Sequence, residues 1–462
     1  MGDLVDEVEV AVLGGGPGGY SAAFRCAELG LETVVIDAAQ RLGGACLFEG
    51  CIPSKALLHV ASVLNEAGRA KEFGVDFGEP RISLDPLRKW KQERVVGKLA
   101  RGLASVAKAR GVEVIGGRGV FEDSSTLRVE AGETLRKVRF KHAIVATGSR
   151  PGGLPGLTQP SERIMDSTAA LDLPDIPERL LVIGGGYIGL ELGTVYATLG
   201  SRVTLVEMTN GLLPGVDRDL VQPLHRRVNT LFTAIHLETR VTALREVGSE
   251  IEADLEGRGG ERFDRVLVAV GRRAQSDGLG LEATRVRLTE HGRFVRVDER
   301  CRTEDPRIYA VGDITGEPML AHRAMRQGKV AAEALAGRPA AFDNVAIPAV
   351  VFTDPEIAWC GLGEAQARDQ GLPVKVGKFQ WAASGRAATL GRSDGLTKVM
   401  ADASSGRVLG VGIVGPGAGE LIAEAALAVE TAALAEDVAL TIHAHPTLSE
   451  SLMEAAEHLL GA

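Results

Sequence analysis

Residues 8–37, VEVAVLGGGPGGYSAAFRCAELGLETVVID, decide the fold of this chain. A short apolar run, Val8 to Leu13, enters a glycine-rich turn, and a helical pattern then continues to about Leu29. Gly30 breaks that pattern, and a second apolar run ends at Asp37. This order predicts a β-strand, a tight turn, an α-helix and a second, parallel strand.

The same unit recurs 170 residues later as residues 180–207, LLVIGGGYIGLELGTVYATLGSRVTLVE. In both copies 23 residues separate the first glycine from a terminal acid, which is Asp37 or Glu207. The pairs that are identical at this offset are Gly14/Gly184, Gly15/Gly185, Gly16/Gly186, Gly19/Gly189, Ala27/Ala197, Leu29/Leu199 and Gly30/Gly200.

The spacing of the glycines is typical of dinucleotide binding. The first glycine of such a turn permits the tight bend, the second lets the backbone approach a pyrophosphate, and the third lets helix and strand pack closely. The helix N-terminus then holds the phosphates, and the acid accepts a hydrogen bond from a ribose hydroxyl. One such motif alone would be an ordinary turn, but two copies in strand–turn–helix–strand context predict two dinucleotide sites.

The acid of the second copy indicates which nucleotide binds there. Glu207 is followed by Met208, Thr209 and Asn210, with no arginine to receive a 2′-phosphate. Because a carboxylate repels that phosphate, the sequence favours NAD over NADP.

Composition excludes several classes of protein. The chain has 462 residues, which suggests about three domains, and 58 of them are glycine with 45% hydrophobic residues. Its net charge of −9, without a basic block, and its 4% aromatic content argue against nucleic-acid binding. No apolar run reaches the ~18 residues of a membrane span, and acids stand where a signal peptide carries positive charge. With five cysteines, too few for a disulfide scaffold, we expect a cytoplasmic protein.

Further apolar runs extend the α/β pattern. Those at 142–145, 266–270 and 307–311 read as strands, and the third leads into Gly312-Asp313. Because ligands collect at the carboxyl ends of strands in such sheets, Asp313 is a candidate for a polar cofactor group, with a strand-ending turn as the alternative. From about Ala346 strands precede helical stretches at 420–434 and 449–460, which predicts a C-terminal α+β domain suited to association.

Two cysteines lie together in the segment GGACLFEGCIPSK, residues 43–55. A regular helix would separate Cys46 and Cys51 by about 7.5 Å, beyond the ~7 Å limit for a disulfide, so a bridge requires a bend that Gly43, Gly44 and Gly50 permit. A bridge closing so small a loop adds little stability, which favours a redox-active dithiol. Two buried structural thiols remain the alternative. Metal binding is disfavoured, because no second Cys/His pair has the spacing of a zinc site.

A histidine and a glutamate near the C-terminus supply a candidate base. His445 lies in HAHPTLSE, and Glu450 enters the first turn of the predicted last helix. A carboxylate that reaches back to one ring nitrogen would orient the imidazole and raise its basicity. The alternative is a helix-capping glutamate beside a packed histidine.

Taken together, the motifs GGACLFEGCIPSK, GGGYIGLELG, VAVGRR, IYAVGDI, MLAHRA, FTDPEIAW, WAASGRA and HAHPTLSE resemble those of the dihydrolipoyl dehydrogenases, which are flavin disulfide oxidoreductases. The resemblance covers almost the whole chain. It implies two Rossmann-like domains, for FAD and NAD(P), and a C-terminal α+β dimerisation domain. The implied domains are residues 1–149 and 276–345 for FAD, 150–275 for NAD and 346–462 for the interface of a homodimer.

The resemblance also implies roles for individual residues. Cys46 would be the interchange thiol, Cys51 would face the flavin, and His445, held by Glu450, would act on the other subunit's disulfide. Glu191 would lie near flavin and nicotinamide, and Tyr187 would gate that face. Implied FAD contacts are Gly14, Gly16, Gly19, Asp37, Lys55, Gly119, Asp313 and Ala321. Implied NAD contacts are Gly184, Gly186, Gly189, Glu207, Val241 and Gly271.

The implied reaction is the oxidation of dihydrolipoamide with NAD⁺ as the acceptor. The implied partners are lipoyl domains and the acyltransferase core of a 2-oxo-acid dehydrogenase complex, or a glycine cleavage complex. A related NAD(P)H-dependent disulfide reductase and a non-enzymatic flavoprotein subunit are the alternatives.

Three positions depart from the family's pattern. Asp37 replaces the usual glutamate, Arg272 to Gln275 replace an arginine–proline–asparagine run, and Phe48-Glu49 lies between the cysteines. If Glu49 points at the cysteines, we expect it to disfavour the thiolate slightly.

Overall fold

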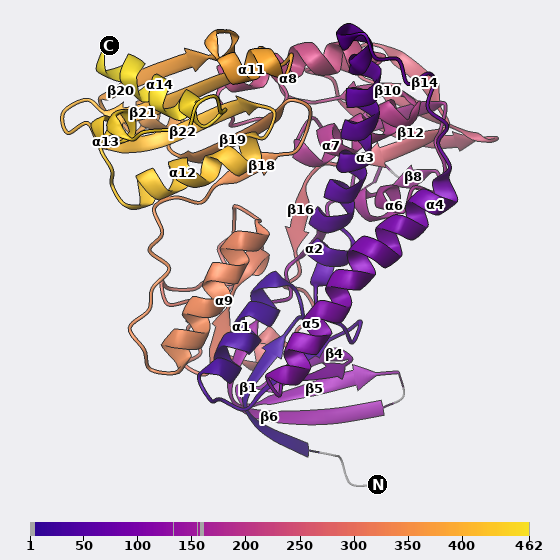
Figure 1. Cartoon of the computed structure of the whole chain (residues 1–462). Coiled ribbons are helices and arrows are strands. Elements are labelled where there is room, and N and C mark those ends of the chain that lie inside the picture. Colours follow the sequence, from indigo (N-terminus) through magenta and orange to yellow (C-terminus); the bar gives the residue numbers. More distant parts are fainter. Residues whose placement is uncertain (1–4, 133, 155, 158–160, 462) are drawn as a thin grey trace. The chain divides into compact units, whose positions relative to one another are not determined.

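The computed structural model describes residues 5–461, except residues 133, 155 and 158–160, and separates the chain into two units (Figure 1). Each unit is assembled from three segments that are distant in sequence. The first unit comprises Met1–Ala56, Ser83–Gly152 and Gly271–Asp343. The second unit comprises Leu57–Ile82, Gly153–Val270 and Asn344–Ala462.

The first unit is built on a sheet in which β1 (Val5–Leu13) lies between β2 (Thr33–Asp37) and β6 (Thr134–Val145), parallel to both. The strand order is β3-β2-β1-β6-β5-β4, and β17 also pairs with β6. Val8 and the residues from Val10 to Leu13 are buried on both faces of β1, as in other central parallel strands. The remaining strands of this sheet are β3 (Glu113–Gly116), β4 (Arg118–Asp123), β5 (Thr126–Ala131) and β17 (Ile308–Ala310).

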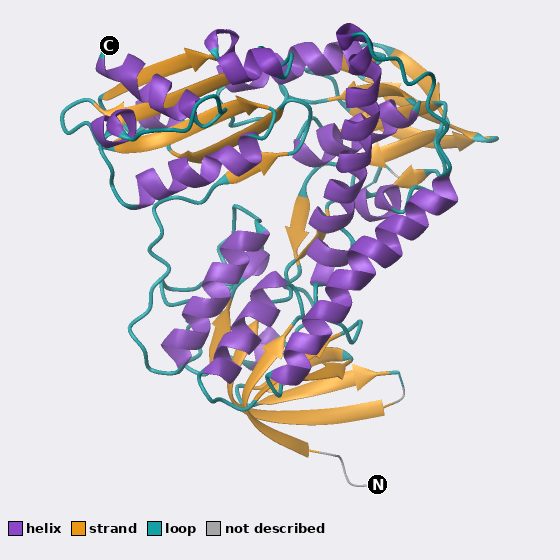
Figure 2. Cartoon of the chain, in the orientation of Figure 1, coloured by secondary structure: helices purple, strands orange, loops and turns teal. Residues whose placement is uncertain are grey.

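Two helices of this unit, α1 (Pro17–Glu28) and α9 (Ala321–Leu335), pack against each other beside the sheet (Figure 2). The approach is so close that a Cβ on Gly328 would lie 2.4 Å from the carbonyl oxygen of Gly18. Residues 8–37 therefore form the predicted strand–helix–strand unit, and a helix from much later in the chain covers it.

A helical region follows this unit. Within it, α2 (Gly44–Phe48) and α3 (Cys51–Arg69) are separated at Glu49-Gly50. The stretch Gly44–Phe73, of 30 residues, contains a window long and apolar enough to cross a membrane. Core helices of soluble proteins meet the same criterion, so length and composition alone do not place it in a lipid bilayer. The other helices of this region are η1 (Ala70–Phe73), α4 (Leu84–Lys89), the π-helix η2 (Trp90–Val96) and α5 (Gly97–Ala109).

The second unit contains the second copy of the repeat. Here β9 (Arg179–Ile183), α7 (Tyr187–Leu199) and β10 (Arg202–Val206) form a strand–helix–strand unit in a parallel sheet of order β11-β10-β9-β15-β8. The strand β15 (Arg265–Val268) ends two residues before the predicted end, because Val270 has left the sheet and is exposed. The other elements are β8 (Ile164–Met165), α6 (Ser167–Leu171), α8 (Arg218–Leu231), β11 (Ala234–His236), β12 (Val241–Val247), β13 (Glu250–Leu255) and β14 (Gly259–Phe263).

The C-terminal part of the second unit is an antiparallel sheet with helices packed against it, which agrees with the predicted α+β domain. One predicted helix, 420–434, is wrong in its extent. It is two helices, α12 (Ala418–Glu430) and α13 (Ala435–Leu440), because Ala432 takes a left-handed conformation with φ 57°. The last helix is α14 (Glu450–Leu460). The other elements are β18 (Ala349–Val351), β19 (Glu356–Gly361), α10 (Glu364–Asp369), β20 (Val374–Gln380), η5 (Trp381–Ala383), α11 (Gly385–Thr389), β21 (Leu396–Asp402) and β22 (Val408–Gly415).

Candidate active site

The three glycines of each repeat meet three different structural demands. Gly14 has φ 108°, and a Cβ there would lie 2.4 Å from the carbonyl oxygen of Ala146. A Cβ on Gly19 would lie 1.8 Å from the carbonyl oxygen of Gly14, so helix–strand packing requires glycine there. A Cβ on Gly16, by contrast, would lie 3.9 Å from its nearest neighbour, the Cα of Gly44. The open space at the second glycine is where a phosphate group would approach the backbone.

The second repeat reproduces these environments. Gly184 has φ 113°, and a Cβ on Gly189 would lie 2.0 Å from the carbonyl oxygen of Gly184. A Cβ on Gly186 would meet nothing within 4 Å. The two turns therefore both fit a dinucleotide, with the phosphates at the N-termini of α1 and α7.

The terminal acid of each repeat hydrogen-bonds to its own glycine turn. The Asp37 carboxylate accepts from the Gly15 amide at 2.8 Å and from the Ala39 amide at 2.9 Å. The Glu207 carboxylate accepts from the Gly185 amide at 2.7 Å and from the Thr209 amide at 2.8 Å. Each carboxylate oxygen can accept a second hydrogen bond, so binding of a ribose hydroxyl stays a prediction for both. The shorter Asp37 reaches its turn as well as Glu207 does.

The two cysteines lie on either side of a helix break, which supplies the predicted bend. Cys46 is in α2, and Cys51 is the first residue of α3. At the break, a Cβ on Gly50 would lie 3.0 Å from the carbonyl oxygen of Ala45. The N-terminus of α2 rests on the phosphate turn, since the Gly43 amide donates to the Gly15 carbonyl at 2.7 Å. The dithiol is thereby attached to the first nucleotide site.

Both cysteines are thiols in the structure, and they interact with each other. The hydrogen bond to Cys51, followed by burial, raises the pKa of the Cys46 thiol, while the charge of Lys55 acts in the opposite direction. Tyr20, which the sequence did not predict to be near the cysteines, has a raised pKa. Burial is the main cause, and the charges of Cys46 and Cys51 add to it. Lys55 is therefore placed to favour a thiolate in this pair, of which Cys46 is half-buried and Cys51 exposed.

The loop between the cysteines has an unusual environment. The guanidinium of Arg41 lies over the ring of Phe48, 3.7 Å from its centroid, a cation–π contact. Glu49 is exposed at the end of α2, and the leading influences on the pKa of Cys46 are Cys51, burial, Lys55 and Asp313. The expected effect of Glu49 on the thiolate stays a prediction.

Asp313 lies at the carboxyl end of β17, in the short helix η4 (Gly312–Thr315). Its carboxylate accepts a hydrogen bond from the Ser149 hydroxyl, which itself accepts from Arg272 Nε at 2.7 Å. Arg272 and Gln275 also donate to the Ser149 carbonyl at 2.8 and 3.2 Å. This arrangement orients Asp313, and it joins β7 (Ser149–Pro151) to β16 (Arg272–Ala274) across the turn that departs from the family's pattern.

Four residues that the resemblance assigns to cofactor binding have defined positions in the fold. Gly119 is buried in β4, where a Cβ would lie 2.4 Å from Leu13 Cδ1. Ala321 is the first residue of α9, Val241 begins β12, and Gly271 has φ 108°. Their contacts with FAD or NAD stay predictions.

Glu191 and Tyr187 both lie on α7, but they differ in exposure. Glu191 is 3% exposed and accepts from the Phe352 amide at 3.0 Å, whereas Tyr187 is 40% exposed. The Phe352 contact was not foreseen, because the two residues are 161 apart in the sequence. Tyr187 is the first residue of α7, and its gating of a nucleotide stays a prediction.

The structure brings the predicted histidine and glutamate together. His445 Nδ1 lies 2.8 Å from Glu450 Oε1, and the other carboxylate oxygen accepts from the Thr447 amide at 2.7 Å. The Thr447 amide and then His445 hold the pKa of Glu450 below its ordinary value. With Nδ1 held by a carboxylate, the exposed imidazole has Nε2 available to accept a proton.

Comparison with protein families agrees with this arrangement. Residues 8–328 match the model described as pyridine nucleotide-disulphide oxidoreductase, and residues 347–456 match the dimerisation domain of the same family. The chain belongs to this family. FAD and NAD, the cofactors predicted from the sequence, are those of the pyridine nucleotide-disulphide oxidoreductases.

Individual members of the family are similar over nearly their whole length. The dihydrolipoyl dehydrogenase of Vibrio cholerae is 48% identical over 98% of this chain and 95% of its own. That of Haemophilus influenzae is 49% identical over 99% and 96%. Among solved structures, LpdA from Mycobacterium tuberculosis has a TM-score of 0.91 at 29% identity, covering 98% of this chain and 99% of its own. The flavoprotein disulfide reductase RclA from Escherichia coli has a TM-score of 0.85 at 26% identity, covering 97% and 99%.

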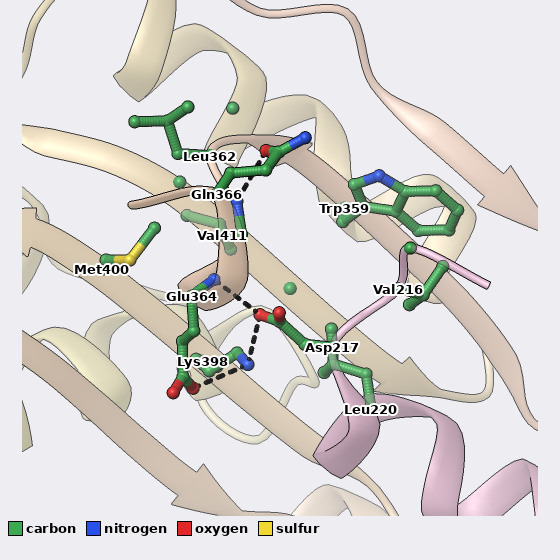
Figure 3. A pocket seen from close by; sticks show the side chains of 15 residues that line it. Val216, Asp217, Leu220, Trp359, Leu362, Glu364, Gln366, Lys398, Met400 and Val411 are labelled. Carbon is green, nitrogen blue, oxygen red and sulfur yellow. Dashed lines mark hydrogen bonds and ion pairs between the residues drawn. The ribbon is translucent and has the colours of Figure 1, made fainter. Parts of the chain in front are cut away.

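One further charged cluster of this family member lies apart from the predicted site residues. Lys398 Nζ, from β21, donates to Asp217, Asp219 and Glu364 at 2.6, 2.8 and 2.9 Å beside a cavity of about 70 Å³ (Figure 3). Although burial opposes the charge, these three contacts raise the pKa of Lys398. The three carboxylates could hold a metal ion by their spacing, but the Lys398 ammonium group already lies among them, and Lys378 also pairs with Asp219 and Glu364. Within the described residues this cluster therefore joins α8 to the C-terminal sheet.

Proposed function

We propose that this chain is a dihydrolipoyl dehydrogenase, which oxidises dihydrolipoamide and reduces NAD⁺. The observation that carries the proposal is the set of chemical groups retained on a full-length match. The dithiol is attached to one dinucleotide turn, Glu207 lies on the other, and His445 is paired with Glu450. A non-enzymatic flavoprotein subunit would need neither the dithiol nor the base.

The reaction begins with proton transfer. His445 Nε2 accepts a proton from one thiol of dihydrolipoamide, and Glu450 stabilises the imidazolium that forms. The substrate thiolate then attacks Cys46 of the oxidised pair, so that the Cys46–Cys51 bond breaks, a mixed disulfide forms and Cys51 leaves as a thiolate. The second substrate thiol then attacks the substrate sulfur of the mixed disulfide, so that the bond from that sulfur to Cys46 breaks and the thiol proton passes to the departing Cys46 sulfur. Lipoamide leaves as a cyclic disulfide, His445 releases the first proton to solvent, and two electrons remain on the cysteine pair.

The turn of Gly14, Gly16 and Gly19 would hold FAD, and that of Gly184, Gly186 and Gly189 would hold NAD⁺. Bound FAD would supply two-electron transfer from the cysteine pair to NAD⁺, which would restore the Cys46–Cys51 disulfide and yield NADH. Lys55 favours the thiolate during this step, and the phosphate turn fixes the position of α2 beside the nucleotide.

The dimerisation domain supports a homodimer. We propose that each active site combines the dithiol of one subunit with the His445–Glu450 pair of the other, as the resemblance implies. We further propose a cytoplasmic enzyme whose substrate is carried on lipoyl domains of a 2-oxo-acid dehydrogenase or glycine cleavage complex.

The test is dihydrolipoamide-dependent reduction of NAD⁺ by the purified flavoprotein. Cys51→Ser and His445→Gln should each remove most of this activity, whereas Cys360→Ala, which changes a buried thiol outside the site, should retain it. Full activity in Cys51→Ser or His445→Gln would refute the mechanism. If only a small disulfide is reduced, with NAD(P)H as the donor, the chain is instead a related disulfide reductase.

The complex served by the enzyme requires a separate experiment. Pull-down of the tagged protein from a cell extract of its source should recover an acyltransferase core that carries lipoyl domains. Recovery of the homodimer without any lipoyl-bearing protein would contradict membership in such a complex.

A further inference from the structure

The loop that carries the proposed base contains a second histidine with the opposite exposure. Residues 441–449 connect α13 to α14 and include both His443 and His445. The His445 side chain is 79% exposed, whereas that of His443 is only 5% exposed. His443 is thus turned into the protein, and the structure must satisfy both of its ring nitrogens.

Both ring nitrogens of His443 face oxygen atoms. Nδ1 lies 2.9 Å from the Thr441 carbonyl oxygen, and Nε2 lies 2.7 Å from Glu424 Oε1 on α12. A backbone carbonyl and an ionised carboxylate can only accept hydrogen bonds. A neutral imidazole has one N–H and satisfies one of them, whereas an imidazole with hydrogen on both nitrogens satisfies both. In that form His443 and Glu424 are an ion pair with a charge-assisted hydrogen bond.

This ion pair is connected to the His445–Glu450 pair in two ways. It fastens the start of the loop to α12, while the Thr447 hydroxyl, donating to the Ala444 carbonyl at 2.7 Å, fastens the middle. It also acts through charge, because the positive charge of His443 contributes to lowering the pKa of Glu450.

The charged groups around His443 come from each neighbouring element. Glu424 faces it from α12, Glu450 acts on it from α14, and His445 shares its loop. Asp437, an acid of α13, has its carboxylate bonded to the Leu434 amide at 2.8 Å. Glu424 is the carboxylate that hydrogen-bonds to His443, and Glu450 receives the electrostatic influence of His443.

We propose that His443 and Glu424 are a positioning pair for the catalytic base: they anchor the His445 loop to α12 and keep a cation behind the His445–Glu450 pair. This role rests on the proposed function. The cation has a defined consequence, because a nearby positive charge makes a second imidazolium less favourable. His445 is then kept free to accept a proton from the substrate thiol.

The test compares three variants with a matched control in the FAD-loaded dimer. The variants are His443→Gln, Glu424→Gln and the two together. The control is His458→Gln, which makes the same change at an α14 histidine whose Nδ1 contacts the Lys378 carbonyl at 2.7 Å. Two reactions are measured: NAD⁺ reduction by dihydrolipoamide as a function of pH, and ferricyanide reduction by NADH, which needs both cofactors but not His445.

In His443→Gln we expect kcat with dihydrolipoamide to fall about tenfold, as for other small misplacements of a catalytic group. The acidic limb of the kcat/KM profile should move to higher pH, because loss of the cation makes a proton on the His445–Glu450 pair less costly. Ferricyanide reduction and FAD content should stay near those of the unsubstituted protein. If the two residues act as a unit, the double variant should be no worse than the worse single variant.

Each other outcome has a definite meaning. An unchanged acidic limb and kcat in His443→Gln, or the same change in His458→Gln, would overturn the proposal. Parallel losses in both reactions would show a merely structural role and overturn it as well. Should the unsubstituted protein reduce ferricyanide but not oxidise dihydrolipoamide, the proposed function fails and the positioning role fails with it. An active unsubstituted protein with a silent His443→Gln overturns the positioning role alone.

Discussion

At the scale of single residues, the chemistry depends on charges placed beside groups that would otherwise be inert. Cys46 is a half-buried thiol whose pKa is raised by its hydrogen bond to Cys51 and by desolvation, so it is a poor nucleophile unless a cation offsets these effects. Lys55, one turn along α3 from Cys51, supplies that cation. The two groups have to be considered together, since neither explains the reactivity of the site alone.

Replacing Lys55 tests this dependence. In Lys55→Gln the pKa of Cys46 should rise further, because the charge that lowers it is removed. The measurement is ultraviolet thiolate absorbance of the reduced protein against pH, whose midpoint should move to higher pH. Lys71→Gln, which removes an exposed lysine paired with Asp76, is the control and should leave the midpoint unchanged. A midpoint that does not move in Lys55→Gln would show that Lys55 has no part in thiolate formation.

At the scale of secondary-structure elements, close packing of backbones sets the position of α2, the short helix that carries Cys46. Because α2 has only five residues, it cannot be stable as an isolated helix. Its N-terminus instead lies directly on the phosphate turn, where a Cβ on Gly44 would be 2.6 Å from Gly16 Cα. Gly44 also has φ 55°, which L side chains rarely adopt.

Gly44→Ala should therefore displace α2 from the phosphate turn. We expect a loss of about 1–3 kcal/mol from the backbone strain alone, seen as weaker FAD retention and a lower thermal midpoint. Gly68→Ala is the matched control, since that glycine lies in α3 and a Cβ on it would meet nothing within 4 Å. Equal FAD retention in the two variants would contradict the proposed contact.

The Lys398 cluster makes a second prediction at this scale. Lys398→Met leaves three carboxylates without their shared cation, which should cost about 3 kcal/mol, measured as a fall in the thermal midpoint. Lys378→Met, at a more exposed lysine of the same cluster, should cost less than about 1 kcal/mol.

The pH dependence of that difference follows from the shifted pKa values. The raised pKa of Lys398 means that its contribution is complete below the ordinary value of 10.5 and is lost as pH rises through the folded-state value. The lowered pKa of Asp219, which burial opposes and the two lysines produce, gives a contribution present above 3.8 and lost as pH falls through the folded-state value. The difference in stability between Lys398→Met and the unsubstituted protein should be constant between these two pH limits and should decrease outside them. A stability difference that changes near neutral pH would show that another titrating group is responsible.

The same elements show what local sequence can predict. The two repeats and the His445–Glu450 pair follow from spacings of a few to about 25 residues, where turn chemistry and helix geometry leave little choice. The contacts that orient Asp313 through Ser149, and Glu191 through Phe352, join residues more than 150 positions apart. No local pattern encodes such a contact. The predicted helix 420–434 failed for a different reason, since apolar periodicity continues across the left-handed Ala432 and hides the break.

At the scale of the whole molecule, the dimerisation domain exposes large apolar side chains in the single subunit. Ile442 is 96% exposed, Leu440 75% and Leu427 63%. Soluble monomers rarely gather such residues without a partner. These side chains are the expected contacts of the second subunit.

Ile442→Asp should therefore convert the dimer to a monomer, as measured by light scattering. Oxidation of dihydrolipoamide should fall with the dimer fraction, while ferricyanide reduction by NADH should persist. Val247→Asp, which places the same charge on an exposed valine outside the dimerisation domain, should stay dimeric and active. A dimeric Ile442→Asp would exclude this residue from the interface.

The contact between Gly18 and Gly328 has a consequence for how the protein is made. The first unit needs segments that end at Ala56 and at Asp343, so a growing chain on the ribosome cannot complete it when its first repeat emerges. At roughly 5–20 residues per second, about 15–60 s pass before α9 is available. During that interval α1 has no helix to cover it, although the second repeat is already whole. We therefore expect the second repeat, with its NAD turn, to be synthesised in full before the first unit, with its FAD turn, is complete. A chain still on the ribosome should bind FAD only after α9 has been synthesised.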